Sequence, residues 1–338
     1  MSPPSTITIP IAFVHNMLHG VRARGLSETS FLADAGIADE LLSQTGSRVT
    51  VAQYIHLFKT IVERLDDDGM GLHSRPLRRG CFALIARSAV STPTLGVAIH
   101  RIARTYRLLQ DDVQIQILRD GKQAGFALAF TDNGKQVSDF LHELLLRVFW
   151  RLLAWLVGGD LPVTRFTFAF ERPLYADSYN RIFPSPQTFD CAHSAFWFDE
   201  TLLKQRVRQD ETSLSSFLKN AQANVILPPR NLNTVSACVR NQLLNTLPQW
   251  SNLASTAASL NISSATLQRK LSAEGTSFQA LKDALRRDHA IVRLNTSTVS
   301  LHELACELAF SDVASFQRAF KGWTGSAPGA YRIMTASH

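Results

Sequence analysis

The sequence is poor in cysteine and lacks any pair of cysteines at metal-binding spacing. Its four cysteines, Cys81, Cys191, Cys238 and Cys306, are spread over 338 residues and form no C-x-x-C motif. This argues against a disulfide framework and against a zinc ribbon, and it fits reduced thiols in the cytosol. We therefore expect a protein without a metal and without another cofactor.

Membrane and export signals are also absent. The first residues lack a basic leader followed by a long apolar run, so they do not form a signal peptide. The most apolar stretch, residues 144–157, is interrupted by Arg147 and Arg151 and is too short and too charged to span a bilayer. The expected location is the cytoplasm, with no membrane contact.

Motifs of the common enzyme classes are missing. The sequence has no Gly-x-Ser-x-Gly, no phosphate-binding P-loop and no Gly-x-Gly-x-x-Gly after a strand. Apolar residues make up 45% and charged residues 19% of the chain, which excludes intrinsic disorder. We expect a folded protein that is not an enzyme.

The first two thirds of the chain mix helices and strands. Apolar residues recur at three- and four-residue spacing over 94–109 and 137–157, which predicts two amphipathic helices. Within the second, Glu143 and Arg147 are four residues apart and can pair along its polar side. Alternating apolar residues predict strands over 113–117, 126–130, 165–170 and 195–198. The pattern favours an α+β domain.

A break in the pattern at 208–232, ending near Pro228 and Pro229, predicts a linker. We expect an α+β domain over 1–207 and an all-α domain over 233–338. Residues 231–338 hold ten Lys and Arg against six Asp and Glu, so this part is more basic per residue than the rest. An excess of positive charge permits a polyanionic partner.

One pattern occurs twice in the C-terminal part, at 253–271 and 301–321. Each copy predicts a short helix, a three-residue turn and a second helix that begins at a Ser or Asp cap. Two helices that cross over a tight turn need small and apolar residues on their inner faces. These residues are Ala257, Leu260, Leu267 and Leu271 in the first copy and Ala305, Leu308, Phe316 and Phe320 in the second.

The outward residues of the second helices suit DNA. Arg and Gln are common readers of guanine and adenine in the major groove, whereas Lys suits phosphates. The first copy presents Gln268, Arg269 and Lys270, and the second presents Gln317, Arg318 and Lys321. Between them, residues 277–294 predict a helix of about 25 Å, which could hold two reading heads about one DNA turn apart. Arg286 and Arg287 on this helix are expected to be solvated or to face phosphates.

The stretch LACELAFSDVASFQRAFKGWTGSAPGAYR, residues 304–332, resembles the signature of AraC/XylS-type transcription regulators. The resemblance covers about 250–332 and adds Phe310, Trp323 and Pro328 to the expected core. It implies base contacts by Ala265, Gln268 and Arg269 from the first copy and by Ala314, Ser315 and Arg318 from the second. The sequence departs from the family at Asn261 and Ala309, where glycine is usual at the turn. Asn tolerates positive φ, whereas Ala does so at a cost near 1 kcal/mol.

The N-terminal part resembles the effector-sensing domain of the ornithine-utilisation and virulence-regulator branch, labelled arabinose-binding-like. Residues 91–109 and 173–203 carry this resemblance, which covers about 10–205. It implies a homodimeric activator that binds operator double-stranded DNA and RNA polymerase and responds to an unidentified small-molecule effector. An alternative is control by protein contact without a small ligand. An alkyl-transfer repair enzyme would need an activated Pro-Cys-His-Arg or zinc-held cysteine, and neither occurs.

Overall fold

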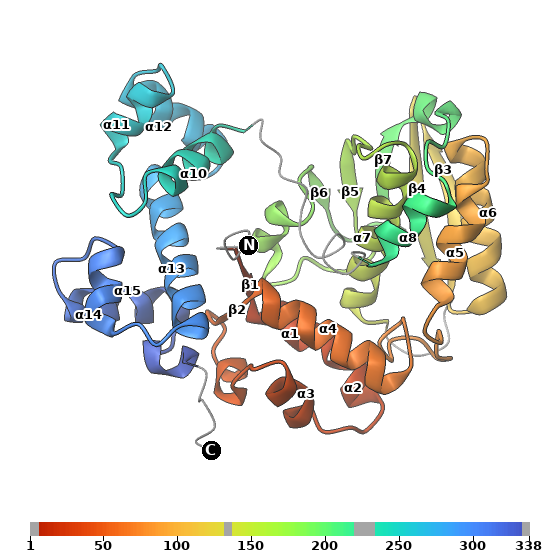
Figure 1. Cartoon of the computed structure of the whole chain (residues 1–338). Helices are drawn as coiled ribbons and strands as arrows, with labels where there is room; N and C mark the ends of the chain where they lie inside the picture. Colours follow the sequence, from red (N-terminus) through yellow and green to blue (C-terminus); the bar gives the residue numbers. More distant parts are fainter. Residues whose placement is uncertain (1–6, 132–136, 220–233, 333–338) are drawn as a thin grey trace. The chain divides into compact units, whose positions relative to one another are not determined.

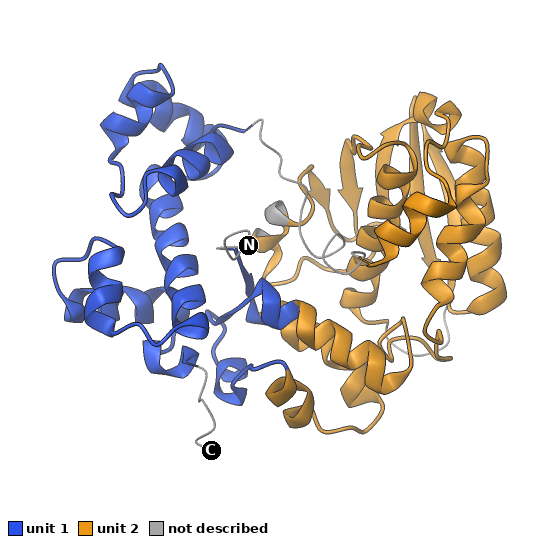
Figure 2. Ribbon diagram, in the orientation of Figure 1, with its two compact units in different colours: residues 1–11, 35–54, 229–338 blue, residues 12–34, 55–228 orange. Residues whose placement is uncertain are grey.

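The computed structural model describes residues 7–131, 137–219 and 234–332. These residues form two compact units that do not follow the order of the chain (Figure 2). Unit 1 contains residues 1–11, 35–54 and 229–338, and unit 2 contains residues 12–34 and 55–228. This grouping differs from the division at 208–232 expected from the sequence, because two N-terminal segments pack with the C-terminal residues.

Unit 2 is the expected α+β fold, built on a mixed five-stranded sheet. The strand order is β3-β4-β7-β5-β6, antiparallel except for the parallel pair β5 and β6. The hairpin predicted around Gly121 is present, with Asp120 opposite Gln123. The strands are β3 Val113–Asp120, β4 Gln123–Phe130, β5 Arg165–Thr167, β6 Gln187–Thr188 and β7 Ser194–Asp199.

Eight helices and two short 3-10 helices (η) complete this part of the chain over the described residues, and Figure 1 shows several of them around the sheet. Two of them, α1 and α4, have their first residues in unit 1. The helices are α1 Ile11–Met17, α2 His19–Ala23, α3 Thr29–Asp34, α4 Val51–Leu65, α5 Cys81–Val90, α6 Leu95–Leu109, α7 Asp139–Leu156, α8 Glu211–Lys219, η2 Ala176–Arg181 and η3 Glu200–Lys204.

Helix α7 is the predicted 137–157 helix, but it is buried on nearly all sides. Its Phe149 packs against Phe126 of β4, with ring centroids 5.2 Å apart. Glu143 and Arg147 were expected to pair along a polar side, yet they are only 1% and 7% exposed. The sequence prediction of a polar side is therefore wrong, because segments distant in the chain cover that side of the helix.

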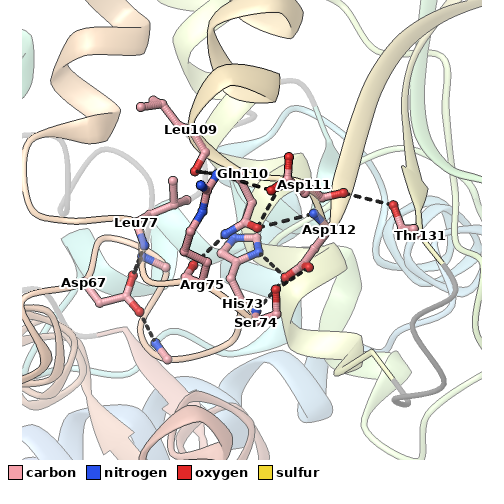
Figure 3. A network of polar contacts seen from close by, with 12 residues as sticks. Asp67, His73, Ser74, Arg75, Leu77, Leu109, Gln110, Asp111, Asp112 and Thr131 are labelled. Carbon is pink, nitrogen blue, oxygen red and sulfur yellow. Dashed lines mark hydrogen bonds and ion pairs between the residues drawn. The ribbon is translucent and has the colours of Figure 1, made fainter.

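A network of polar contacts fixes the loop between α4 and α5 (Figure 3). Asp67 is fully buried and accepts hydrogen bonds from the backbone N–H groups of Gly69, Gly71 and Leu77 at 2.8–2.9 Å. Asp112, just before β3, accepts from both the backbone and the hydroxyl of Ser74 at 2.6 Å. Each carboxylate satisfies N–H groups that have no secondary-structure partner. The network therefore holds the shape of the loop.

The expected linker is partly helical. Helix α8 lies within it and buries Leu214 and Phe217, and the Phe217 ring stacks on Trp155 of α7 at 4.5 Å. Residues 220–233, which hold the rest of the predicted linker, lie outside the described residues. The part of the linker that is described thus belongs to the packed core of unit 2.

Unit 1 joins a helical bundle to a two-stranded ribbon. The ribbon pairs β1 and β2 in antiparallel register, with Ile9 opposite Val49. Figure 1 shows α13 as a long central helix with α11 and α12 near one end and α14 and α15 near the other. The elements are β1 Thr8–Pro10, η1 Asp39–Ser43, β2 Arg48–Thr50, α10 Val235–Asn245, α11 Leu253–Ser259, α12 Ser264–Ala273, α13 Phe278–Thr296, α14 Leu301–Glu307, α15 Val313–Thr324 and η4 Pro328–Tyr331.

Candidate DNA-binding interface

Both expected helix-turn-helix motifs form, and each of their helices has a side-chain cap. A capping box of Asn252 and Ser255 begins α11, and one of Ser300 and Glu303 begins α14. The second helices begin at Ser263 and Asp312, which accept hydrogen bonds from backbone N–H groups one turn on. Each such cap contributes about 1 kcal/mol.

The predicted core residues lie where the motif needs them. Seven are at most 1% exposed, and Pro328 is also buried at the start of η4. Leu260, Phe310 and Trp323 are half-buried. The seven are Ala257, Leu267 and Leu271 in the first motif and Ala305, Leu308, Phe316 and Phe320 in the second.

The two turns have the same geometry despite their different residues. Asn261 and Ala309 both have φ 54°. The next residue donates its N–H to the small residue of the first helix, from Ile262 to Ala257 at 3.1 Å and from Phe310 to Ala305 at 2.9 Å. The alanine therefore does not distort the second turn but holds it in the left-handed region, which is unfavourable for a side chain with a Cβ.

We expect Ala309→Gly to raise the free energy of unfolding of unit 1 by about 1 kcal/mol, because glycine adopts positive φ without a steric cost. Urea denaturation of the two proteins would measure the difference. Ala314→Gly is the matched control, since Ala314 is also exposed but lies within α15, where glycine should lower stability by about 0.5–1 kcal/mol. Equal effects of the two substitutions would contradict the strain at Ala309.

The residues proposed to read bases are on the surface. Ala265, Gln268 and Arg269 on α12 are exposed, as are Ala314 and Arg318 on α15. Lys270 and Lys321, expected at phosphates, are also exposed.

Ser315 is the exception among the expected base readers, since it is half-buried. Its hydroxyl donates to Asp312 at 2.9 Å and accepts from the Arg318 guanidinium at 3.0 Å. Ser315 thus orients Arg318, and its hydroxyl is engaged within the helix.

Arg286 and Arg287 have contacts that disfavour the expected phosphate role. The Arg287 guanidinium makes two hydrogen bonds to Asp288 at 2.8 and 3.0 Å. The Arg286 guanidinium lies over the rings of Trp250 and Phe310 at 5.4 and 5.0 Å. The pattern of charges on the helix did not reveal the ring partners of Arg286, which come from segments before and after α13 in the sequence.

Arg286 also belongs to a bridge between the two motifs. It donates to the carbonyl of Ala309 in the second turn at 3.3 Å. Trp250, which precedes α11, donates its indole N–H to the carbonyl of Glu307 in α14 at 2.9 Å. These contacts join the first motif directly to the second, so the spacing of the two recognition helices does not depend on α13 alone.

The ribbon of β1 and β2 supports α13 through buried polar groups. Thr8 donates its hydroxyl to Asp288 at 2.6 Å, and the guanidinium of Arg48 lies 3.7 Å from the same carboxylate. Gln53, in the first turn of α4, donates to Asn295 at 2.8 Å, about two helical turns beyond Asp288 along α13. Sequence reasoning missed these residues, because two three-residue strands give no periodic signal and the partners of Thr8, Arg48 and Gln53 lie at least 240 residues away.

None of the helices in the described ranges is long and apolar enough to cross a bilayer.

Comparison with known proteins gives two family matches. Residues 25–207 match the arabinose-binding domain of AraC transcription regulators, and residues 256–334 match a helix-turn-helix domain. Among curated proteins, the chain is 24% identical over 326 residues to the ornithine utilization regulator of Pseudomonas aeruginosa, covering 96% of each chain. It is 23% identical over 343 residues to an uncharacterized HTH-type transcriptional regulator of Mycobacterium tuberculosis, covering 98% of each.

Among solved structures, the transcriptional regulator CdpR from Pseudomonas aeruginosa is similar at 20% identity and a TM-score of 0.34, over 94% of this chain and 96% of that one. The family match alone spans more than half of the chain. The match to a helix-turn-helix domain falls on the two helix-turn-helix motifs. The chain therefore belongs to the AraC-type DNA-binding transcription regulators.

Proposed function

We propose that the chain regulates transcription by placing α12 and α15 in two adjacent major grooves of operator DNA. The observation that carries this proposal is the exposure of Gln268, Arg269 and Arg318 on two capped helices that lie near opposite ends of α13. The 19 residues of α13 span about 28 Å, near the ~34 Å of one DNA turn. The small exposed side chains of Ala265 and Ala314 let the helices approach the base edges closely.

The proposal includes control by a small molecule at unit 2. The match of residues 25–207 to an arabinose-binding domain supports a sensing role for this part of the chain. The effector shifts an equilibrium between states that differ in operator affinity, and the usual outcome in the family is activation. A homodimer that contacts RNA polymerase completes the proposal. The competing form is a regulator controlled by protein contact alone, which would show no change in stability with any metabolite.

Replacing Arg318 with alanine should weaken binding to the cognate operator by roughly 1–3 kcal/mol and relax sequence preference at one base pair. Its guanidinium is exposed and donates to the Ser315 hydroxyl, and an arginine of this kind can make paired hydrogen bonds to guanine. The measurement is fluorescence anisotropy with an operator selected from a random library, and with non-specific DNA at the same salt concentration. An equal loss on both DNAs would place Arg318 at a phosphate.

Lys321→Ala is the matched control from the next turn of α15. An exposed lysine that contacts a phosphate contributes to binding through counterion release. Binding should therefore weaken on both DNAs alike, and the slope of log affinity against log salt should fall by about 1. If the salt dependence of binding has the same slope as in the original protein, Lys321 does not contact a phosphate.

A further inference from the structure

One buried carboxylate of unit 2 has an oxygen with no hydrogen-bond partner among the described residues. Glu143 projects from α7 and is 1% exposed. Its Oε1 accepts hydrogen bonds from the hydroxyls of Tyr175, at 2.9 Å, and Tyr179. Its Oε2 is buried and has no hydrogen-bond partner among the described residues. A buried polar atom left in this way loses its hydration without gaining a hydrogen bond in return.

Protonation does not remove the problem. Burial raises the pKa of Glu143 from 4.5 to about 7, so both charge states are accessible near neutral pH. The ionised form lacks a donor for Oε2, and a proton on Oε2 lacks an acceptor. Either form is therefore completed only by a further group at this oxygen.

The surroundings are aromatic and acidic. The ring of Phe13 in α1 packs edge-on to Tyr175, with centroids 5.2 Å apart, and Asn16 donates to the Tyr175 hydroxyl at 2.5 Å. Asp139, one turn before Glu143, has its pKa raised by burial and by the charge of Glu171. Tyr175, Asn16 and Asp139 are each half-buried, whereas Glu143 itself is buried.

The charges select the class of ligand. Glu143, Asp139 and Glu171 disfavour an anion, and the buried Arg147, whose charge acts on Glu143, has its own contacts. A primary ammonium group supplies both the N–H donor and the positive charge that Oε2 lacks. Aromatic faces such as those of Phe13 and Tyr175 attract cations electrostatically.

A surface recess elsewhere in unit 2 is less suitable as an effector site. It is lined by Asp34, His56, Thr60, Glu63 and Arg64, between α3 and α4. Arg64 already pairs with Asp34 there, and the recess contains no buried polar atom without a partner among the described residues. The Arg64–Asp34 pair is thus satisfied without a ligand.

We propose that Glu143 is the recognition group of the effector site, and that the effector is a small amine whose ammonium group donates to Oε2 beside the rings of Phe13 and Tyr175. This inference rests on the proposed function, in which unit 2 senses a small molecule, and it adds the position and the chemical class.

The test compares amines with matched compounds that lack the terminal ammonium group. Thermal unfolding and calorimetric titration of the full chain at pH 8 would use n-butylamine against 1-butanol, and L-ornithine against L-norvaline. At least one amine should raise the Tm progressively with concentration, and its matched compound should not. In Glu143→Gln, which keeps an oxygen for both tyrosines, amine affinity should fall at least tenfold.

Glu63→Gln, in the recess between α3 and α4, is the control variant and should bind the amine as the original protein does. Tyr175→Phe keeps the ring and should bind with a loss smaller than that of Glu143→Gln. Equal amine binding by the original protein and by Glu143→Gln overturns the inference, and so does the absence of binding by every amine tested.

Operator binding distinguishes the two levels of the proposal. If a metabolite without an ammonium group alters operator affinity, the inference about Glu143 fails while effector control stands. If amines bind at Glu143 but leave operator affinity unchanged, the site exists and the proposed effector control fails. Glu143→Gln must unfold cooperatively for the comparison to count, and Tyr175→Phe provides an independent reading of the same site.

Discussion

Asp288→Ala should lower the free energy of unfolding of unit 1 by about 3–5 kcal/mol, because it leaves buried positive charge without its partner. Asp288 is 2% exposed and accepts hydrogen bonds from Thr8 and Arg287. Arg48, itself 9% exposed, completes the cluster at 3.7 Å. Hydrogen exchange of the α13 amides reports this unit separately from unit 2, and urea denaturation gives the free energy.

The control for this substitution is Asp283→Ala on the same helix. Asp283 is half-buried and accepts one exposed hydrogen bond from Gln279 at 2.9 Å, so its removal should change stability by less than about 0.5 kcal/mol. Combining Asp288→Ala with Arg48→Ala in a double-mutant cycle isolates their interaction. Similar losses for Asp283→Ala and Asp288→Ala would show that the ribbon does not stabilise α13.

The second large effect is a pH-dependent gain of stability in Glu143→Gln. The pKa of Glu143 is about 7 in the folded protein and near 4.5 when unfolded. Because the folded state binds the proton more tightly, stability is lost as pH rises through this interval, by up to about 3 kcal/mol. Glutamine does not titrate, so the variant should be more stable than the original protein by about this amount at pH 8.

Urea denaturation without ligand at pH 5 and pH 8 measures this gain. Near pH 5 the two proteins should differ much less than at pH 8. The neighbouring His142 has its pKa lowered to about 4 by burial, so its contribution is lost as pH falls. It is present in both proteins and cancels in the difference. A difference between the two proteins that is the same at both pH values would mean that Glu143 keeps an ordinary pKa.

The parts of the fold that the sequence predicts are those with local causes. Caps at Ser263 and Asp312, small residues at Ala257 and Ala305, and a hairpin at Gly121 each act within a few residues. For the same reason, the second helices present Arg269 and Arg318 to solvent as expected.

The missed features depend on partners far along the chain. Arg286 has the composition of a solvated charge, and only the folded chain brings Trp250 and Phe310 against it. Glu143 follows the spacing of a surface ion pair, and only the packing of Tyr175 and Tyr179 makes it a buried carboxylate. Periodicity reports which face of a helix is apolar, but not what covers the polar face.

The ribbon on α13 also imposes an order on synthesis. Thr8 and Asp288 are 280 residues apart, and translation at about 5–20 residues per second separates their emergence by roughly 15–60 s. During that interval Thr8 and Arg48 have left the ribosome but their acceptor has not been made. Unit 1 is therefore completed only late in translation, and a nascent chain that stops before α13 cannot assemble it.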